Sequence, residues 1–446
     1  MGFPFDPVGA GLVYNVKSYG AFGDGVHDDT AAIQAAANAA GNAANGGIVY
    51  LPPGRYAISS TITVTGQNVT LQGAGWSVTV AGLTNVVSLG TSRSVIAPLA
   101  SFPANSYAVD FNNTSNMILG VGFAGLTIDG SAAQSVSNVS AIHFGNAAFF
   151  RCHDFSIELI SGSAVVIDQA GATYSFPSTS QMWFDNFWVH SIGNHGIWLP
   201  SGDFTTEVFI HDFWLSDVPS GNSIYIDSGS GTGKVFIHDG TISGAGNGIW
   251  LAAYETLIHD CNITGAWNNG IYLASGQAAG FYSQIHHNII RDNDKNQNGS
   301  ANVYIEAGAT NCRFDHNQLY AQNVTTEYGF YVPSGIGANG IIVDGTNMAA
   351  NHKTANFYSN GVASNYTRWT PPSSSFALPA SGTAWTNNTG VDGTLYVTGA
   401  GVVTDVVVQG VTVASSLSVG QSYFVPAGGT ITFTYTTAPT LVFVGD

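Results

Sequence analysis

The chain has 446 residues, of which 45% are hydrophobic and only 8% are charged, and its formal net charge is −17. The 27 acidic residues outnumber the 10 Lys and Arg residues, which excludes nucleic-acid binding and disfavours anionic membranes. No run is apolar enough to insert into a membrane, and a polar surface made of Gly, Ser, Thr and Asn is typical of an extracellular or virion surface.

One amphipathic helix is predicted, close to the N-terminus. The opening residues lack the basic and apolar runs of a signal peptide, so we expect none in this chain. Asp28–Thr30 offers N-cap chemistry, an Ala-rich helix follows over Thr30–Ala44, and a strand follows at Ile48–Leu51. We expect residues 1–45 to cap the open end of a stack of strands.

A strand pattern repeats through the middle of the chain. Apolar–aromatic–apolar triplets stand at Ile197–Leu199, Ile224–Ile226, Ile249–Leu251, Ile271–Leu273, Val303–Ile305 and Phe330–Val332, with a weaker copy at Val165–Asp168. The central residues of the six triplets are 27, 25, 22, 32 and 27 positions apart. Two further apolar strands recur within each repeat, and repeats of this length indicate a stacked array of coils. Three strands per turn, all running the same way, predict a parallel β-helix over residues 46–369.

The repeat stops after residue 360. Residues 370–379, rich in Pro and Ser, are predicted as a linker. Residues 380–446 alternate apolar and polar positions between Gly-rich turns, which predicts a small β-sandwich. This unit either caps the C-terminal edge of the stack against strand addition or has a binding or assembly role. The fold class is all-β.

Three stretches near the N-terminus resemble a known family. The runs YNVKSYGAFGDGVHDDTAAIQAAANAA, GGIVYLPPGRYAI and VTLQGAG are similar to the pectate-lyase superfamily domain of right-handed β-helix proteins. That group includes polysaccharide lyases, glycoside hydrolases and phage tailspike depolymerases. The resemblance implies a right-handed helix and a polysaccharide partner, and its tailspike members imply a homotrimer with a C-terminal unit that trimerises or binds sugar. The motif contains no catalytic residues and does not choose among these chemistries.

The triplet aromatics are predicted to form an outward stripe. Side chains alternate faces along a strand, so aliphatics inside the coil place the aromatics outside, one above another. An elongated row of rings suits stacking against the sugars of a polymer, and the candidate substrate-binding residues are Trp198, Tyr225, Trp250, Tyr272 and Tyr304. Large exposed apolar patches also mark subunit interfaces, so the stripe could instead contact a second copy of the chain.

An Asn-rich corner precedes the triplets. Asn222, Asn247 and Asn269 occupy one place in consecutive repeats, where Asn tolerates left-handed backbone and can form side-chain ladders. His195 holds this place in the preceding repeat and resembles the Gly-His-Gly segment of polygalacturonases, although that family's other motifs are missing here. We expect His195 to be either a substrate-contacting aid to catalysis or a plain corner residue.

Carboxylates border the predicted stripe. Asp168 and Asp227 hold equivalent positions two coils apart, which corresponds to ~9–10 Å and approaches the separation in an inverting glycosidase. Asp203 lies in the turn between them. These three are the candidate catalytic residues, one as general acid and another as the base that activates water. They could instead be solvated loop acids, with Glu207, Glu255 and Glu306 as reserves.

No metal or cofactor is predicted. The recurrent Ile-His-Asp motif places histidines in a column on the outside of the coil, which spreads potential ligands along a line instead of around one point. We expect a structural ladder there. The three cysteines, Cys152, Cys261 and Cys312, cannot all pair and are predicted to be buried free thiols.

The leading hypothesis is an extracellular or virion-borne protein that binds a polysaccharide and hydrolyses it. A polysaccharide lyase is the first alternative, although Arg151, Arg291 and Arg313 do not lie in an acidic cluster that would supply its base and metal. A non-catalytic receptor-binding or adhesive spike is the second.

Overall fold

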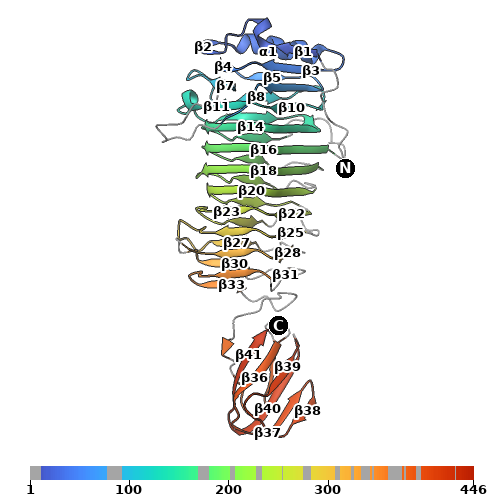
Figure 1. The fold of residues 1–446 in the computed structure, drawn as a ribbon, viewed down its shortest axis with the longest axis vertical. Coiled ribbons are helices and arrows are strands. Elements are labelled where there is room, and N and C mark those ends of the chain that lie inside the picture. Colours follow the sequence, from blue (N-terminus) through green and yellow to red (C-terminus); the bar gives the residue numbers. More distant parts are fainter. Residues whose placement is uncertain are drawn as a thin grey trace.

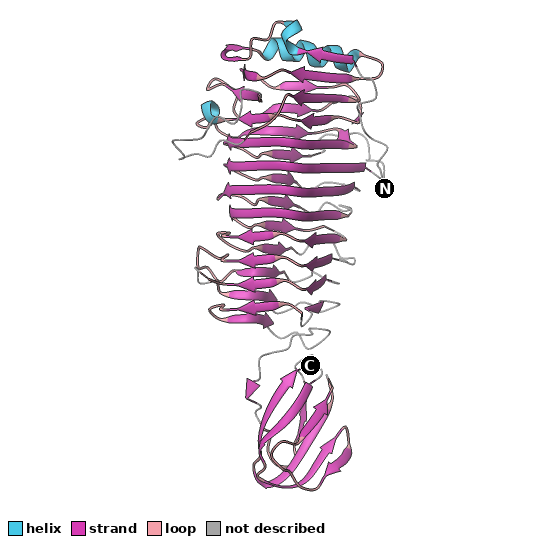
Figure 2. Cartoon of the chain, viewed as in Figure 1, coloured by secondary structure: helices cyan, strands magenta, loops and turns pink. Residues whose placement is uncertain are grey.

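Three ladders of parallel strands build most of the chain, as the long stack in Figure 1 shows. The computed structural model describes residues 12–77, 93–168, 180–200, 206–227, 234–253, 255–274, 283–306, 312–322, 326–332, 342–343, 346–359, 374–375, 378–387, 393–426 and 428–445. Strands dominate this part of the chain, and helical turns are confined to its N-terminal third (Figure 2). None of the described helices is long and apolar enough to cross a bilayer.

The triplets form an 11-stranded parallel sheet, which we call the triplet sheet. Its strands are β5 (Ile62–Val64), β8 (Ser106–Phe111), β12 (Val139–Phe144), β15 (Val165–Ile167), β17 (Ile197–Leu199), β19 (Ile224–Ile226), β21 (Ile249–Leu251), β24 (Ile271–Leu273), β27 (Ala301–Ile305), β30 (Tyr328–Val332) and β33 (Ala355–Ser359). Within β17 both Ile197 and Leu199 are fully buried while Trp198 is partly exposed, and the same alternation recurs in the next strands. The prediction that aliphatics face inward and aromatics outward is therefore confirmed.

The other two ladders share a 20-stranded sheet. The first ladder contains β1 (Leu12–Asn15), β3 (Gly47–Leu51), β6 (Val69–Gly73), β10 (Gly122–Ala124), β22 (Thr256–His259), β25 (Ser283–His286), β28 (Cys312–Asp315) and β31 (Ile342–Val343). The second contains β2 (Asp24–Asp28), β4 (Gly54–Ile58), β7 (Ser94–Pro98), β11 (Thr127–Asp129), β23 (Asn262–Thr264), β26 (Ile289–Arg291), β29 (Gln318–Tyr320) and β32 (Met348–Ala350). Four long strands run through both: β14 (Phe150–Ile160), β16 (Ser180–Ile192), β18 (Thr206–Val218) and β20 (Val235–Ala245). A two-stranded pairing joins β9 (Ile118–Leu119) and β13 (Ala147–Ala148).

A sharp bend separates the first ladder from the second in each coil. Asp212, Asp239 and Asp260 occupy this bend with φ of 53°, 53° and 54°. Asp tolerates the left-handed region better than most residues, which explains its recurrence there. The sequence analysis assigned left-handed backbone to the asparagines before the triplets, and that assignment was wrong, because Asn222 and its equivalents keep negative φ.

The asparagine side chains nevertheless form the predicted ladder. The Nδ2 amide of Asn247 donates to Oδ1 of Asn222 at 2.8 Å, and that of Asn269 donates to Asn247 at 3.1 Å. A second ladder, which the sequence analysis did not predict, is buried inside the coil and joins Asn288, Asn317 and Asn347.

The predicted cap forms over the N-terminal end of the stack. Helix α1 (Thr30–Asn42) follows the 3-10 turn η1 (Val16–Tyr19), and Asp28 accepts a hydrogen bond from the Thr30 backbone N–H at 3.0 Å. Ile33 and three alanines on one helix face are buried in the same core as the first strands. A short 3-10 turn, η2 (Ser131–Ala133), is the other helical element of the described chain.

The C-terminal residues form a separate antiparallel unit. One four-stranded sheet contains β34 (Ser374–Ser375), β36 (Gly393–Gly399), β39 (Ser422–Val425) and β41 (Thr440–Gly445). The other contains β35 (Ala384–Thr386), β37 (Val402–Val408), β38 (Val411–Ala414) and β40 (Thr430–Thr437). Leu395, Val406 and Phe433 belong to a core distinct from that of the coils, as expected of a β-sandwich. Since β34 pairs with β41, this unit begins inside the stretch predicted as a linker.

The three cysteines are free and buried, which confirms that prediction. Burial raises the pKa of Cys261 and that of Cys312 to about 12, so both remain thiols at neutral pH.

Candidate functional site

The outward aromatic column runs along the triplet sheet in strict register. Trp198 pairs with Tyr225 and Tyr225 with Trp250, and the order continues through Tyr272, Tyr304, Tyr331 and Tyr358. Ring centroids of Tyr272 and Tyr304 lie 4.9 Å apart and stacked, and those of Tyr225 and Trp250 lie 4.5 Å apart, edge to face. All seven rings are partly exposed. The column therefore forms one aromatic strip. It adds Tyr331 and Tyr358 to the five rings predicted from the sequence.

The same outward column becomes polar toward the N-terminal end of the sheet. Asp110 of β8 pairs with His143 of β12, and His143 pairs with Val166 of β15, which in turn pairs with Trp198. Two positions beyond Val166 stands Asp168, one of the predicted catalytic residues. Charged side chains and rings thus share one face of the coil.

His143 lies at the centre of a hydrogen-bonded network. Its Nδ1 lies 2.7 Å from Oδ1 of Asp110, its Nε2 lies 3.1 Å from Oδ1 of Asp168, and its ring stacks on that of Tyr107 at 4.1 Å. The side chain is buried, which by itself would lower the pKa of His143. The bonds and charges of the two carboxylates outweigh burial and raise that pKa to about 9. His143 is therefore an imidazolium at neutral pH that donates to a carboxylate from each ring nitrogen.

Tyr107 completes this network as a neutral group. Burial raises the pKa of Tyr107 to about 12, and the negative charges of Asp168 and Asp110 add to that shift. Together the four groups provide one buried cation, two carboxylates and a phenol within reach of the outer surface of the coil.

Asp227 holds the position equivalent to that of Asp168, two strands further along. The backbone N–H of Asp168 donates to Phe144 at 3.1 Å and that of Asp227 donates to Leu199 at 2.8 Å, so each residue continues its strand in the same way. Two strand spacings separate their backbones by ~9.6 Å. The Tyr225 hydroxyl donates to Oδ2 of Asp227 at 3.4 Å. Asp203 lies outside the described residues.

His195 lies at the start of the asparagine ladder and beside the aromatic column. Its ring centroid is 4.7 Å from that of Tyr225 and 5.2 Å from that of Trp198. Its Nδ1 accepts a hydrogen bond from the Asn222 backbone N–H at 3.1 Å, which requires that nitrogen to be unprotonated. Burial lowers the pKa of His195 to about 4, so the imidazole is neutral. This geometry matches the predicted corner residue, and contact with a substrate stays a prediction.

The sequence analysis missed Tyr107, Asp110 and His143. The signal was present, because Val109–Phe111 and Ile142–Phe144 are apolar–X–apolar triplets with Asp or His in the aromatic place. Polar centres hide both copies from a pattern defined by aromatic or aliphatic centres.

A second set of outward rings lies on the first ladder. Trp183, Phe209 and Phe236 stack with centroids 3.9 and 4.8 Å apart. This column has no buried cation or carboxylate network comparable to that of His143 among the described residues. It is therefore a candidate contact surface and not a candidate reaction centre.

A hollow of about 540 Å³ lies near the capped end of the coil. Thr65 and Asn113, which follow β5 and β8, line it together with Gly41 of α1. None of the four network residues lines this hollow.

Comparison with known proteins finds similarity to pectate-lyase-like and right-handed β-helix proteins. A family model described as "Rhamnogalacturonase A/epimerase, pectate lyase-like" matches residues 13–213, and one described as "Right handed beta helix region" matches residues 177–360. The mannuronan C5-epimerase AlgE6 of Azotobacter vinelandii is 40% identical over 141 residues, which are 30% of this chain and 14% of the epimerase. Alginate lyase 7 of the same organism is 33% identical over 134 residues, 30% of this chain and 14% of the lyase. The match thus spans about one seventh of each of these relatives.

A solved structure supports the fold alone. A mutant tailspike protein of E. coli bacteriophage HK620, solved in complex with a pentasaccharide, aligns with a TM-score of 0.54 at 10% identity. The alignment covers 97% of this chain and 93% of that one.

Proposed function

Because this chain is a pectate-lyase-like protein with a right-handed parallel β-helix, we propose that it is a polysaccharide-degrading enzyme that hydrolyses glycosidic bonds on the triplet sheet. The observation that carries the proposal is the placement of Asp168 and Asp227. They hold equivalent outward positions, two strands apart, along the edge of one aromatic column.

The proposed substrate lies along the aromatic column. Because most rings of the column stack on their neighbours, the column offers ring edges at intervals of about one strand spacing to successive sugars, and the tyrosine hydroxyls offer hydrogen bonds to them. The binding residues in this proposal are His195, Trp198, Tyr225, Trp250, Tyr272 and Tyr304.

In the proposed reaction, Asp168 is the general base and Asp227 the general acid. Nε2 of the His143 imidazolium donates to Oδ1 of Asp168 and orients this carboxylate, which takes a proton from water. The water attacks the anomeric carbon while Asp227 protonates the departing glycosidic oxygen. A backbone separation of ~9.6 Å leaves room for that water, as inverting glycosidases require. Asp110 fixes the imidazolium from its other side and is a positioning residue.

A second candidate function is a lyase or epimerase reaction, in which a proton is removed from the carbon beside a carboxylate. The Tyr107 phenol, partly exposed beside the His143 imidazolium, favours it, since a phenol on the outer face of the coil can act as an acid or a base toward a sugar. The relatives named as mannuronan epimerase and alginate lyase favour it as well.

We also propose that the protein assembles as a homotrimer on an extracellular or virion surface. The second aromatic column, Trp183, Phe209 and Phe236, supplies an outward apolar surface that lies away from the proposed substrate strip. The mass of the particle in solution by light scattering tests this, and three chains of 46.4 kDa are expected. A particle with the mass of one chain would contradict it.

The catalytic proposal is tested on a panel of polysaccharides. We expect release of reducing ends without unsaturated products that absorb ultraviolet light. Asp168→Asn and Asp227→Asn should each lower the rate by about 10² or more, because each removes a proton-transfer group. Asp212→Asn, at an exposed bend of another ladder, is the matched control and should keep full activity.

Three outcomes would contradict the proposal. Unsaturated products would indicate a lyase, conversion of sugars without cleavage would indicate an epimerase, and tight binding without turnover would indicate a binding spike.

A further inference from the structure

A column of stacked imidazoles runs beside the bend that separates the first strand ladder from the second. In three successive coils a histidine just before the bend lies 2.8 Å from the carboxylate of the next residue: His211 with Asp212, His238 with Asp239 and His259 with Asp260. Neighbouring imidazoles stack at 4.9 and 4.8 Å. In these coils each Nδ1 already has its own carboxylate, so the imidazole column agrees with the structural role predicted from the sequence.

The pattern breaks in the next coil. His286 continues the stack, 5.1 Å from His259, but the residue at the bend is His287 instead of Asp. The Nδ1 atoms of the two histidines lie 2.8 Å apart. Only one hydrogen can lie between two imidazole nitrogens, whereas a cation can accept a lone pair from each.

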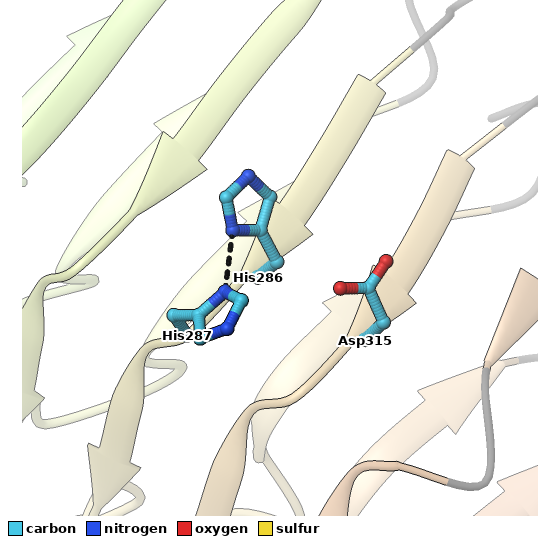
Figure 3. Close-up of side chains that lie close together, drawn as sticks. All are labelled: His286, His287 and Asp315. Atoms are coloured by element: carbon cyan, nitrogen blue, oxygen red, sulfur yellow. Dashed lines mark hydrogen bonds between the residues drawn. The ribbon is translucent and has the colours of Figure 1, made fainter.

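A carboxylate from the neighbouring strand completes the cluster. Asp315 of β28 pairs in register with His286 of β25, and the three side chains approach one another as Figure 3 shows. Their ligand atoms all lie within 4.8 Å of one another. Arg313 Nε and His316 Nδ1 lie 2.8 and 3.1 Å from the Asp315 carboxylate, and these contacts fix its orientation.

We propose that His286, His287 and Asp315 bind one divalent transition-metal ion of the zinc class. Two imidazoles and one carboxylate suit zinc and its neighbours, whereas calcium and magnesium prefer oxygen ligands throughout. Tetrahedral zinc sites with Zn–N bonds of ~2.0–2.1 Å hold two nitrogens about 3.3 Å apart, so the two rings need to separate by about 0.5 Å. His287 is exposed and lies at a bend, so its ring can move by this distance without displacing buried neighbours.

The bound ion would connect two adjacent coils. His286 and His287 belong to one coil and Asp315 to the next, and the fourth ligand position is left to water. The site lies on the first ladder and the aromatic column on the triplet sheet, so this inference does not rest on the proposed function.

The test is a calorimetric titration of the metal-stripped full chain with zinc chloride. We expect one equivalent to bind, and thermal unfolding to shift upward in its presence. His287→Asn should weaken binding by about tenfold or more, the order of loss typical when a metal site is disrupted. Asn suits this bend, because Asn186 occupies the same place in another coil with φ of 50°. His238→Asn is the matched control and should leave the affinity unchanged.

A second variant guards against loss of fold. Asp315→Asn should also weaken binding about tenfold, and both variants should unfold within a few degrees of the parent when metal is absent. The inference is overturned if the parent chain binds no zinc. It is also overturned if His287→Asn binds as tightly as the parent, or if His238→Asn weakens binding equally, because the imidazole column would then bind metal along its whole length.

Discussion

At the residue scale, His143 is the group whose surroundings depart most from those of a surface histidine. It is 5% exposed and has a carboxylate on each ring nitrogen. A buried cation of this kind is stable only while both partners remain, since removing one leaves a buried charge partly unpaired. The network therefore couples the protonation of one residue to the stability of three neighbouring strands, β8, β12 and β15.

His143 predicts a dependence of stability on pH. Its pKa is raised from 6.5 to about 9 by folding, so its contribution is complete below pH ~6.5 and is lost as the pH rises through ~9. The loss amounts to about 3 kcal/mol at most. Denaturant unfolding measured between pH 6.5 and 10 should show this decline, and His143→Gln should be less stable at pH 6.5 and show a smaller decline. A decline of equal size in the variant would contradict this assignment.

Sequence reasoning reached part of this site. Asp168 was predicted because it follows an apolar triplet at an outward position, and it does lie in the network. His143, Asp110 and Tyr107 come from strands 25 to 61 residues earlier, and only the register between coils places them beside Asp168. Reading each outward position across all coils, whatever its residue type, would have found them.

At the element scale, side-chain hydrogen bonds link successive turns in a way that the sequence did not predict. The buried ladder of Asn288, Asn317 and Asn347 repeats once per coil, and each amide serves both a neighbouring asparagine and a backbone carbonyl. The strands were predictable because alternation of burial follows from the β-strand itself. The position of the bend was not predictable, because Asp, His and Asn all tolerate left-handed backbone and the sequence has each of them at several turns.

Asn317 tests the ladder. Asn317→Ala removes the bonds that the Asn317 amide donates to Asn347 and to the carbonyl of Ile285. It also removes the oxygen that accepts from both the backbone N–H and the side-chain amide of Asn288. We expect a loss of about 2–4 kcal/mol in the free energy of unfolding, measured by denaturant titration. Gln318→Ala, at the exposed neighbouring position, is the control and should change it by less than about 0.5 kcal/mol. Equal effects of the two substitutions would show that the ladder adds nothing.

At the scale of the whole molecule, a capped stack of coils and a separate sandwich provide distinct surfaces. The division into residues 1–45, 46–369, 370–379 and 380–446 stays a proposal, with the first C-terminal strand pairing already at Ser374. Fold and handedness were predictable, because repeat length and the N-terminal motif specify them together. The chemistry was not predictable, because one fold can carry many different reactions and the N-terminal motif contains no catalytic residue.

The anomeric configuration of the first product tests most directly whether Asp168 and Asp227 act as an inverting pair, as proposed. NMR of a polysaccharide undergoing cleavage should show the newly released reducing end with the configuration opposite to that of the bond that was cleaved. This signal should be absent with Asp168→Asn and present with Asp212→Asn. Retention of configuration, an unsaturated sugar end, or no cleavage of any polysaccharide tested would contradict the account.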